Sequence, residues 1–436
     1  MAETNTRSVA EKELLRVIGR WSLAALTINS IVGSGIFGLP SLVADLLGRL
    51  SPLAVILAGA AMAVIVACYA EVASQFSETG GTYLYARAAL GRFVGLQVGW
   101  MTMLSRFTAC AANANLLVIY LGEFWPQVAH PLLRFCVITA LLGLLTLVNY
   151  CGVRGGTLIS NAFVIAKLAP LALICIAGGM YLATHSAVPA PTPTFGAHSW
   201  RTALLLLFFA YGGYEAALNP MGEARNPKRD AAFALFTALG VVTVIYTIIQ
   251  FVVVGVVPAS LHSQRPLADA TQVLLGRGGA VLVAAAALVS VYGYLSANLL
   301  TAPRQIFALA EQRDFPDVFA SVHPKFKTPH VAILIFAFLT WTLALAGGFT
   351  WNVTLSAVSR LFYYAAICVA LPVLRRSQPR SAWFRLPAGP VLASLGVMIC
   401  LVLVTGVDFS KSLILLATAA IALVNWIFVR NRPGVS

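Results

Sequence analysis

Four ionisable residues interrupt apolar stretches that are long enough to cross a membrane: Arg106, Lys167, Glu215 and Arg360. An ionisable side chain inside a membrane span costs free energy, so it indicates a functional site by default. Three of the four are basic and one is acidic. Ion pairing, proton transfer and the binding of charged groups are the chemistry available to them.

Glycines interrupt two of the apolar stretches near their middle. The first stretch carries Gly33, Gly35 and Gly38 within six residues, and the sixth carries the pair Gly212-Gly213. Unwound backbone at membrane depth persists only where it is buried in protein or lines a cavity. Interrupted spans in matching places of two halves are the best sequence indication of a transporter site. Taken singly, either set of glycines could equally be a helix-packing position.

Breaks of this kind predict a zwitterionic ligand. The N-terminus of a half-helix presents unpaired N–H groups and partial positive charge, which suit a carboxylate. The opposite end of a half-helix presents unpaired carbonyls, which suit an ammonium group. An α-amino acid carries both groups and would satisfy both ends at once.

The composition is that of an integral membrane protein. Of the 436 residues, 59% are hydrophobic and 10% are charged, whereas a soluble domain carries about 25% charged residues. The net charge of +14 does not indicate a nucleic-acid partner, because the basic residues gather in alternate loops. The polar first 20 residues do not resemble a cleavable signal peptide. The seven cysteines show no disulfide or metal spacing, so we expect no metal and no cofactor.

Twelve apolar segments predict an all-α protein with twelve membrane helices. The expected spans are 21–46, 52–74, 93–121, 132–150, 157–183, 202–222, 231–257, 279–309, 329–347, 351–374, 388–407 and 411–429. Nineteen basic residues lie on one side of these spans and about five on the other, which places both termini in the cytoplasm of a multi-pass cell-membrane protein.

The spans predict the following domain organisation. A cytoplasmic segment 1–20 precedes a ten-helix core 21–374, built from inverted repeats 21–183 and 202–374; helices 388–429 and a cytoplasmic tail 430–436 follow. Five spans per repeat make the second copy inverted. The proline-rich stretch 188–195 is expected to be an extended linker outside the cell.

Several motifs, in order along the chain, resemble those of the amino acid–polyamine–organocation (APC) superfamily. They are residues 33–37 (GSGIF), 78–83 (ETGGTY), 209–215 (FAYGGYE), 223–229 (EARNPKR), 303–304 (PR) and 322–329 (VHPKFKTP). Each motif alone is weakly specific, but their order and spacing together are specific. The resemblance implies a LeuT-type fold with broken first and sixth spans, and secondary transport of amino acids by alternating access.

The resemblance also implies which residues form the site. The backbone amides of Ser34, Gly35 and Ile36 are expected to hold the substrate carboxylate. The carbonyls expected to hold the α-amine are those of Ile31, Phe209, Ala210 and Gly212. Coupling or gating is expected of Lys167, Glu215 and Tyr211.

Lys167 matches a fifth-span lysine of proton-coupled or sodium-independent relatives. In those relatives the ammonium is thought to occupy the place of a sodium ion, so sodium-independent transport is expected, as proton symport or exchange. Lys167 would then be a strut on the unwound first span, or a proton carrier, since burial favours the neutral amine. For Glu215, capping a half-helix N-terminus or gating is favoured over proton coupling or contact with a cationic substrate.

Arg106 is expected to pair with backbone carbonyls or with Glu215. The alternative is contact with an acidic substrate side chain. Arg360 resembles a structural arginine of the tenth span and is expected to pack internally, while Glu71 is expected to be interfacial. Candidate pocket walls are Asn113, Asn115, Tyr211, Tyr214, Tyr292 and Tyr294, any of which could equally be an ordinary packing residue.

Three other functions fit parts of the sequence. A polyamine or organic-cation carrier would have the same fold, but one buried acid beside three buried bases argues against a polycation. A transport-inactive amino acid sensor is equally compatible with the fold. A channel would more naturally show pore-lining rings from repeated subunits. A membrane enzyme would need a catalytic constellation of residues, and the sequence shows none. The expected partners are a small-molecule substrate, the lipid bilayer and coupling protons; an accessory subunit stays an open question.

Overall fold

The computed structural model describes residues 18–76, 80–152, 157–187, 196–258, 263–377 and 382–430, without the side chains of 157–166, 220 and 222. The proline-rich stretch 188–195, positions 78 and 79 of the second motif, most of the segment 1–20 and nearly all of the tail 430–436 lie outside the described residues. So do six of the nineteen basic residues that indicate the orientation, namely Arg7, Lys12, Arg16, Arg154, Arg380 and Arg432.

The described part of the chain is almost entirely helical. Its helices are α1 (Arg20–Ile31), α2 (Ser34–Gly38), α3 (Pro40–Leu47), α4 (Ser51–Ala73), α5 (Gly81–Leu121), α6 (Pro131–Cys151), α7 (Thr157–Thr184), α8 (Ala197–Tyr211), α9 (Pro227–Val256), α10 (Pro266–Glu311), α11 (His330–Ala346), α12 (Phe349–Ser377), α13 (Gly389–Val404) and α14 (Phe409–Val429), with short 3-10 helices η1 (Gly48–Leu50), η2 (Pro126–Ala129), η3 (Tyr214–Glu223) and η5 (Asp317–Ala320). Proline opens several of them, where its missing N–H costs nothing.

Each of the twelve expected segments contains helix, but their lengths differ. Within the described ranges, nine helical segments are long and apolar enough to cross a membrane, counting α1 with α2 and α3 with α4 as one segment each. Helices α11 and α13 are apolar but only 17 and 16 residues long, and α8 has 15 residues because the sixth segment stops being α-helical at Tyr211. The protein therefore has several membrane-spanning helices, and the count of twelve stays a prediction.

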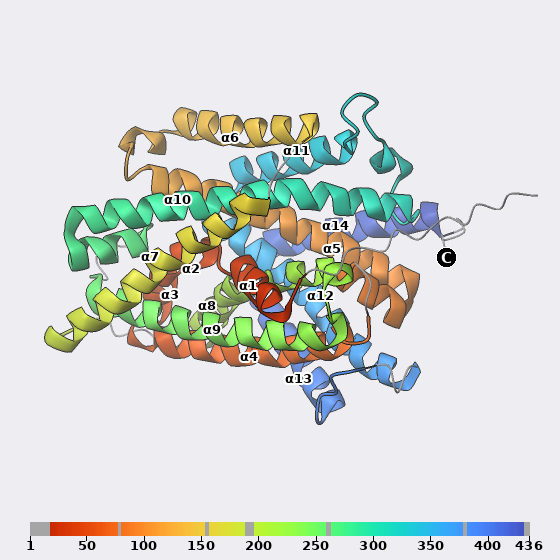
Figure 1. The fold of residues 1–436 in the computed structure, drawn as a ribbon, viewed down its shortest axis with the longest axis horizontal. Helices are drawn as coiled ribbons and strands as arrows, with labels where there is room; N and C mark the ends of the chain where they lie inside the picture. Colours follow the sequence, from red (N-terminus) through yellow and green to blue (C-terminus); the bar gives the residue numbers. More distant parts are fainter. Residues whose placement is uncertain are drawn as a thin grey trace, which may run out of the picture.

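The helices form a bundle around α1, α8 and α12. Helix α10 runs the length of the molecule, with α6 and α11 on one side of it and α9 and α4 on the other (Figure 1). Helix α12 packs against α5 and α8, while α1 packs against α9 and η3. The segment before α1 also pairs with the segment after η3, since the N–H of Ile18 donates to the carbonyl of Glu223 at 3.0 Å. The two interrupted segments are thus joined at one end of the bundle.

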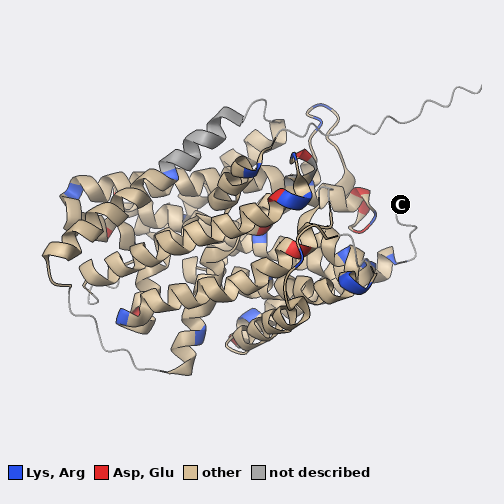
Figure 2. Cartoon of the chain, turned by 60° about the horizontal axis from the view of Figure 1, so that its bottom comes forward, with Lys and Arg blue, Asp and Glu red and all other residues tan. Residues whose placement is uncertain are grey.

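Most charged residues lie toward the ends of the helices, with long uncharged stretches between them (Figure 2). Two buried acids at the helix ends, Asp314 and Glu71, are ion-paired. Asp314 accepts hydrogen bonds from Arg87 at 2.7 Å and Arg92 at 2.6 Å. Glu71 is fully buried and binds Arg375 through both carboxylate oxygens, at 2.6 and 2.7 Å.

Glu71, expected to be interfacial, lies in the last turn of α4, and its side chain is buried against protein. The chain after α12 folds back over the end of α4, and the N–H of Leu386 donates to the Glu71 carboxylate at 2.7 Å. A buried carboxylate is tolerated when its oxygens are paired and hydrogen-bonded in this way.

Candidate functional site

The first break lies between α1 and α2. Helix α1 ends at Ile31, and two residues, Val32 (φ −70°, ψ 97°) and Gly33 (φ −139°, ψ −148°), leave the helical conformation before α2 begins at Ser34. A Cβ atom at Gly33 would lie 3.7 Å from Cδ2 of Tyr294. The break therefore faces α10 as well as α8.

The second break lies between α8 and η3. Gly212 is extended (φ −75°, ψ 163°) and Gly213 has φ +112°, a value that favours glycine. A Cβ atom at Gly213 would collide with the carbonyl oxygen of Ser30, and one at Gly212 would lie 2.6 Å from Cζ of Arg360. Gly213 is required by backbone shape and by close approach, and Gly212 by the close approach of Arg360 alone.

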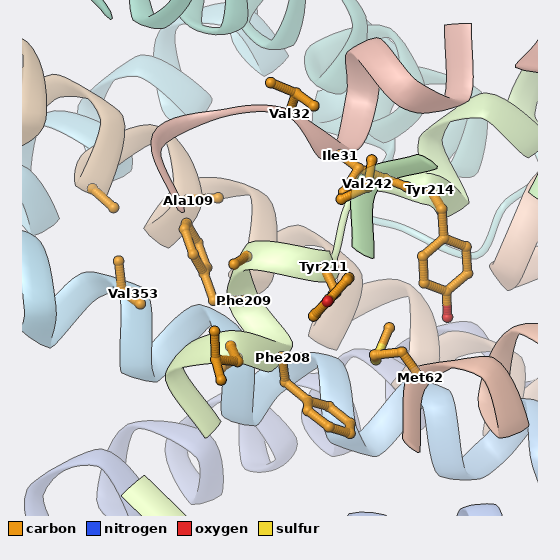
Figure 3. Packing of buried hydrophobic residues seen from close by; sticks show 14 of the residues in the cluster. Ile31, Val32, Met62, Ala109, Phe208, Phe209, Tyr211, Tyr214, Val242 and Val353 are labelled. Atoms are coloured by element: carbon orange, nitrogen blue, oxygen red, sulfur yellow. The ribbon is translucent and has the colours of Figure 1, made fainter. Parts of the chain in front are cut away.

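The structure brings the two breaks into contact. A Cβ atom at Gly35 would lie 2.7 Å from Cα of Ala210, and Figure 3 shows Ile31 beside Val242, with Tyr211 at the end of α8 close by. The hydroxyl of Tyr246, from α9, lies within hydrogen-bond distance of the Ile31 carbonyl (3.4 Å) and the Ala210 carbonyl (3.3 Å).

Tyr246 was absent from the sequence expectations. The signal that could have identified it is its position, because it is the one tyrosine in the apolar run of α9. A buried tyrosine hydroxyl usually has a hydrogen-bond partner. In a membrane span the partner must be protein, so a mid-span tyrosine points to accessible carbonyls nearby.

The ammonium group of Lys167, a residue of α7, lies beside the C-terminal end of α1. Its Nζ donates to the carbonyl of Val32 at 3.4 Å, and its side chain is almost fully buried. A cation is favoured at a helix C-terminus, where unpaired carbonyls carry partial negative charge. The contact is the one expected of a strut on the unwound first span.

Glu215 lies at the N-terminal end of η3 and is enclosed by donors. One carboxylate oxygen accepts from the N–H of Gly213 at 3.0 Å. The other accepts from Nη1 of Arg360 and from the hydroxyl of Tyr363, both at 2.8 Å. The bond to Gly213 is a capping interaction, and the ion pair with Arg360 is buried.

The expected pairing of Arg106 with Glu215 is therefore wrong. The guanidinium of Arg360 passes over Gly212, where the absence of a side chain leaves room for it, and it forms the ion pair with Glu215. Among the described residues Arg106 makes one hydrogen bond, to Oδ1 of Asn298 at 3.4 Å, and the expected bond to a backbone carbonyl is not among its contacts. Arg360 does pack internally, as expected, but as the partner of Glu215.

The side chains of four of the candidate pocket walls make other contacts or are exposed. The Tyr211 hydroxyl donates to the Val55 carbonyl on α4 at 3.0 Å. Tyr214 stacks on Tyr364, with ring centroids 5.6 Å apart. Asn115 is bound to Arg134 and to the carbonyls of Ala344 and Gly347, away from the breaks. Tyr292 is 40% exposed.

Asn113 and Tyr294 remain as wall candidates. The amide nitrogen of Asn113 donates to the Ala109 carbonyl at 2.8 Å, while its oxygen is buried without a partner in the described part of the chain. Tyr294 is the candidate that lies directly against the first break. Of the six residues proposed, Tyr294 is therefore the best placed.

The residues expected to hold the substrate all lie at the two breaks. Ser34, Gly35 and Ile36 form the start of α2, which has no acidic residue in its first turn and no side-chain cap. The Ser34 hydroxyl is buried and has no hydrogen-bond partner within the described ranges. Phe209 and Ala210 end α8 beside Gly212.

Comparison with known proteins decides the family. The family model described as amino acid permease matches residues 18–427, which include both breaks. The chain belongs to the amino acid permease family. It is a family of membrane transporters within the APC superfamily, as the motifs predict.

Individual relatives of this permease agree with the family. The methylthioribose transporter of Bacillus subtilis is 28% identical over 423 residues, covering 92% of this chain and 90% of the relative. The branched-chain amino acid permease BcaP and the serine/threonine exchanger SteT of the same organism are each 27% identical, covering 90% and 88% of this chain and 88% and 89% of their own lengths. These matches support transport of amino acids at the level of the family.

Proposed function

We propose that this permease is a secondary active transporter that carries α-amino acids across the cell membrane by alternating access. The substrate would lie between the two helix breaks, and one helix group would rock or gate against another around it. Both termini would lie in the cytoplasm, because the basic residues favour that side. No chemical step on the substrate is part of this proposal.

The observation that carries the proposal is the charge pattern at the paired helix ends. Nζ of Lys167 donates to the carbonyl of Val32, the residue that follows α1, and the Glu215 carboxylate accepts from the N–H of Gly213 at the start of η3. The N-terminus of α2 has neither an acidic residue in its first turn nor a side-chain cap. The amides of Ser34, Gly35 and Ile36 are thus available for a carboxylate.

The α-amine would bind on the opposite side of the same space. The carbonyls of Ile31, Phe209, Ala210 and Gly212 border the breaks there. Tyr246 already approaches two of them, at distances of 3.3 and 3.4 Å that are long for a hydroxyl hydrogen bond. A substrate ammonium, with three donors and a full charge, would bind these carbonyls more strongly than the phenol does.

The coupling is proposed to be sodium-independent, by proton symport or by exchange. Lys167 places a protein cation on the carbonyl of Val32, where a metal ion would otherwise find an oxygen ligand. Glu215 would act in gating rather than as a proton carrier, because its pairing with Arg360 favours the ionised carboxylate. Tyr211 would contribute to gating through its position at the end of α8.

The alternatives differ in what they require of the same site. A polyamine or organic-cation carrier would have to bind its substrate beside Arg106, Lys167 and Arg360 with one acid to offset them, and Glu215 is already paired. A transport-inactive sensor would bind an amino acid without moving it.

The test uses the purified full chain in liposomes. Radiolabelled amino acids are offered with and without an inward proton gradient, with and without internal substrate, and with sodium replaced by choline. We expect uptake or exchange of at least one amino acid at the same rate in choline. Failure of every amino acid to bind or move would end the proposal, and binding without any movement would favour the sensor.

A further inference from the structure

Among the described residues, Arg106 has no acidic partner. Its side chain is half-buried in the middle of α5, and its single hydrogen bond among the described residues is the 3.4 Å contact with Asn298. A guanidinium has five N–H donors and usually bonds neutral acceptors at 2.7–3.2 Å. Most of its N–H donors therefore have no acceptor among the described residues.

A short chain of contacts connects Arg106 with the first break. The Asn298 side-chain nitrogen donates to the carbonyl of Tyr294 at 3.0 Å, which turns its oxygen toward Arg106. The ring of Tyr294 lies against the position of Gly33. These contacts place Arg106 on the α10 side of the first break, linked through Asn298 to the residue that meets Gly33.

The charges around the breaks do not balance. Arg106, Lys167 and Arg360 contribute three positive charges, and Glu215 contributes one negative charge that Arg360 already neutralises. Lys167 is partly compensated by the carbonyl end of α1. Arg106 has a neutral amide as its partner, and an uncompensated cation at membrane depth is unfavourable unless a ligand supplies the missing charge.

We propose that Arg106 binds an acidic group on the substrate side chain, so that the preferred substrate is an α-amino acid with a second carboxylate. The inference rests on the proposed transport function and on the placement of the backbone-binding groups given there. The α-carboxylate would take the amides of α2, the amine would take the carbonyls of α8, and the side-chain carboxylate would reach Arg106. Such a substrate carries one net negative charge and offsets the unpaired guanidinium.

The experiment compares acids with their amides. Uptake and substrate-induced thermal stabilisation are measured for L-aspartate, L-glutamate, L-asparagine and L-glutamine with the wild-type chain, Arg106→Gln and Arg106→Lys. We expect the wild type to prefer an acid over its amide by about tenfold or more, and Arg106→Gln to lose that preference. Arg106→Lys, which keeps the charge, should retain part of it.

Arg201→Gln is the matched control. Arg201 lies at the far end of α8, where it contacts Ala197 and Thr405, and its loss should leave the acid-to-amide ratio unchanged. A wild type that moves neutral amino acids but discriminates against the acids would overturn the inference and leave the proposed function standing. So would an unchanged ratio in a folded Arg106→Gln. If Arg106→Gln does not fold, the wild-type ratio decides alone. If no amino acid binds or moves, the proposed function itself fails.

Discussion

The two helix breaks are stabilised by side chains of opposite charge. At the first break a lysine donates to a carbonyl, through one contact of 3.4 Å between Lys167 and Val32. At the second break a glutamate accepts from an amide and is held by Arg360 and Tyr363 at 2.8 Å. The difference follows from the polarity of a helix, whose C-terminus attracts cations and whose N-terminus attracts anions.

The same comparison indicates how firmly each break is held. The second break has a closed network, because Glu215 has donors on both oxygens and its neighbouring rings pack on one another. The first break has one long hydrogen bond from Lys167 and a tyrosine hydroxyl shared between two carbonyls. Changes at the second break should therefore mainly damage the fold, and changes at the first should mainly damage transport.

The largest effect is expected from Glu215→Ala. The substitution leaves Arg360 buried without its anion, and breaking a buried ion pair in this way costs about 3–5 kcal/mol. Thermal unfolding of the purified protein in detergent should show a marked loss of stability. The double variant Glu215→Gln with Arg360→Met removes both charges and should recover part of it. A Glu215→Ala protein as stable as the wild type would contradict the ion-pair interpretation.

A somewhat smaller loss is expected from Gly213→Ala. Gly213 has positive φ, and its added methyl group would meet the carbonyl of Ser30, so the cost should exceed the roughly 1 kcal/mol of backbone strain alone. Gly240→Ala is the control, because Gly240 lies in α9 with open space around its Cβ position. If both variants unfold at the same temperature as the wild type, the close contact between the breaks is not needed for stability.

Lys167→Ala should affect transport more than stability. The strut and the proton-carrier roles both require the ammonium group, so we expect uptake to fall about tenfold or more, equivalent to about 1.4 kcal/mol. The thermal stability should change less than in Glu215→Ala, because one 3.4 Å hydrogen bond is lost. Uptake is measured in liposomes at equal protein content. Full transport by Lys167→Ala would exclude both roles.

The smallest effect is expected from Tyr246→Phe. The substitution removes the hydroxyl between the Ile31 and Ala210 carbonyls and keeps the ring, so about 1 kcal/mol of stability should be lost. Because the same carbonyls are proposed to bind the α-amine, the apparent substrate affinity should rise or stay constant while stability falls. A loss of affinity larger than the loss of stability would mean that the hydroxyl itself contacts the substrate.

The sequence was most informative where structure depends on local chemistry. The apolar runs predict helices because backbone groups in a membrane must bond within the segment. Gly33, Gly35, Gly212 and Gly213 predict the breaks because glycine tolerates conformations that other residues resist. The motif order also identifies the family, which the match over residues 18–427 confirms.

The sequence was least informative about which charges meet. Arg106 and Arg360 both lie in apolar runs, and nothing in their neighbours indicates which one binds Glu215. Glu71 lies near the end of its apolar run, where an interfacial position is expected, yet its carboxylate binds Arg375, which is 304 positions away in the chain. Pairings of this kind depend on which helices pack together, and helix packing is a property of the whole bundle.

The sequence by itself determined the membrane class, the family and the two glycine breaks, because these depend on composition and on short-range backbone preferences. The tertiary structure alone decided that the breaks touch and that Arg360 neutralises Glu215 across Gly212. It also decided that Arg106 has a neutral amide as its partner among the described residues. The physical reason is that an ion pair forms between the groups that packing brings within about 4 Å. Within the described residues, that selection pairs Arg360 with Glu215 and leaves Arg106 beside Asn298, which is the basis of the proposal that Arg106 binds an acidic substrate group.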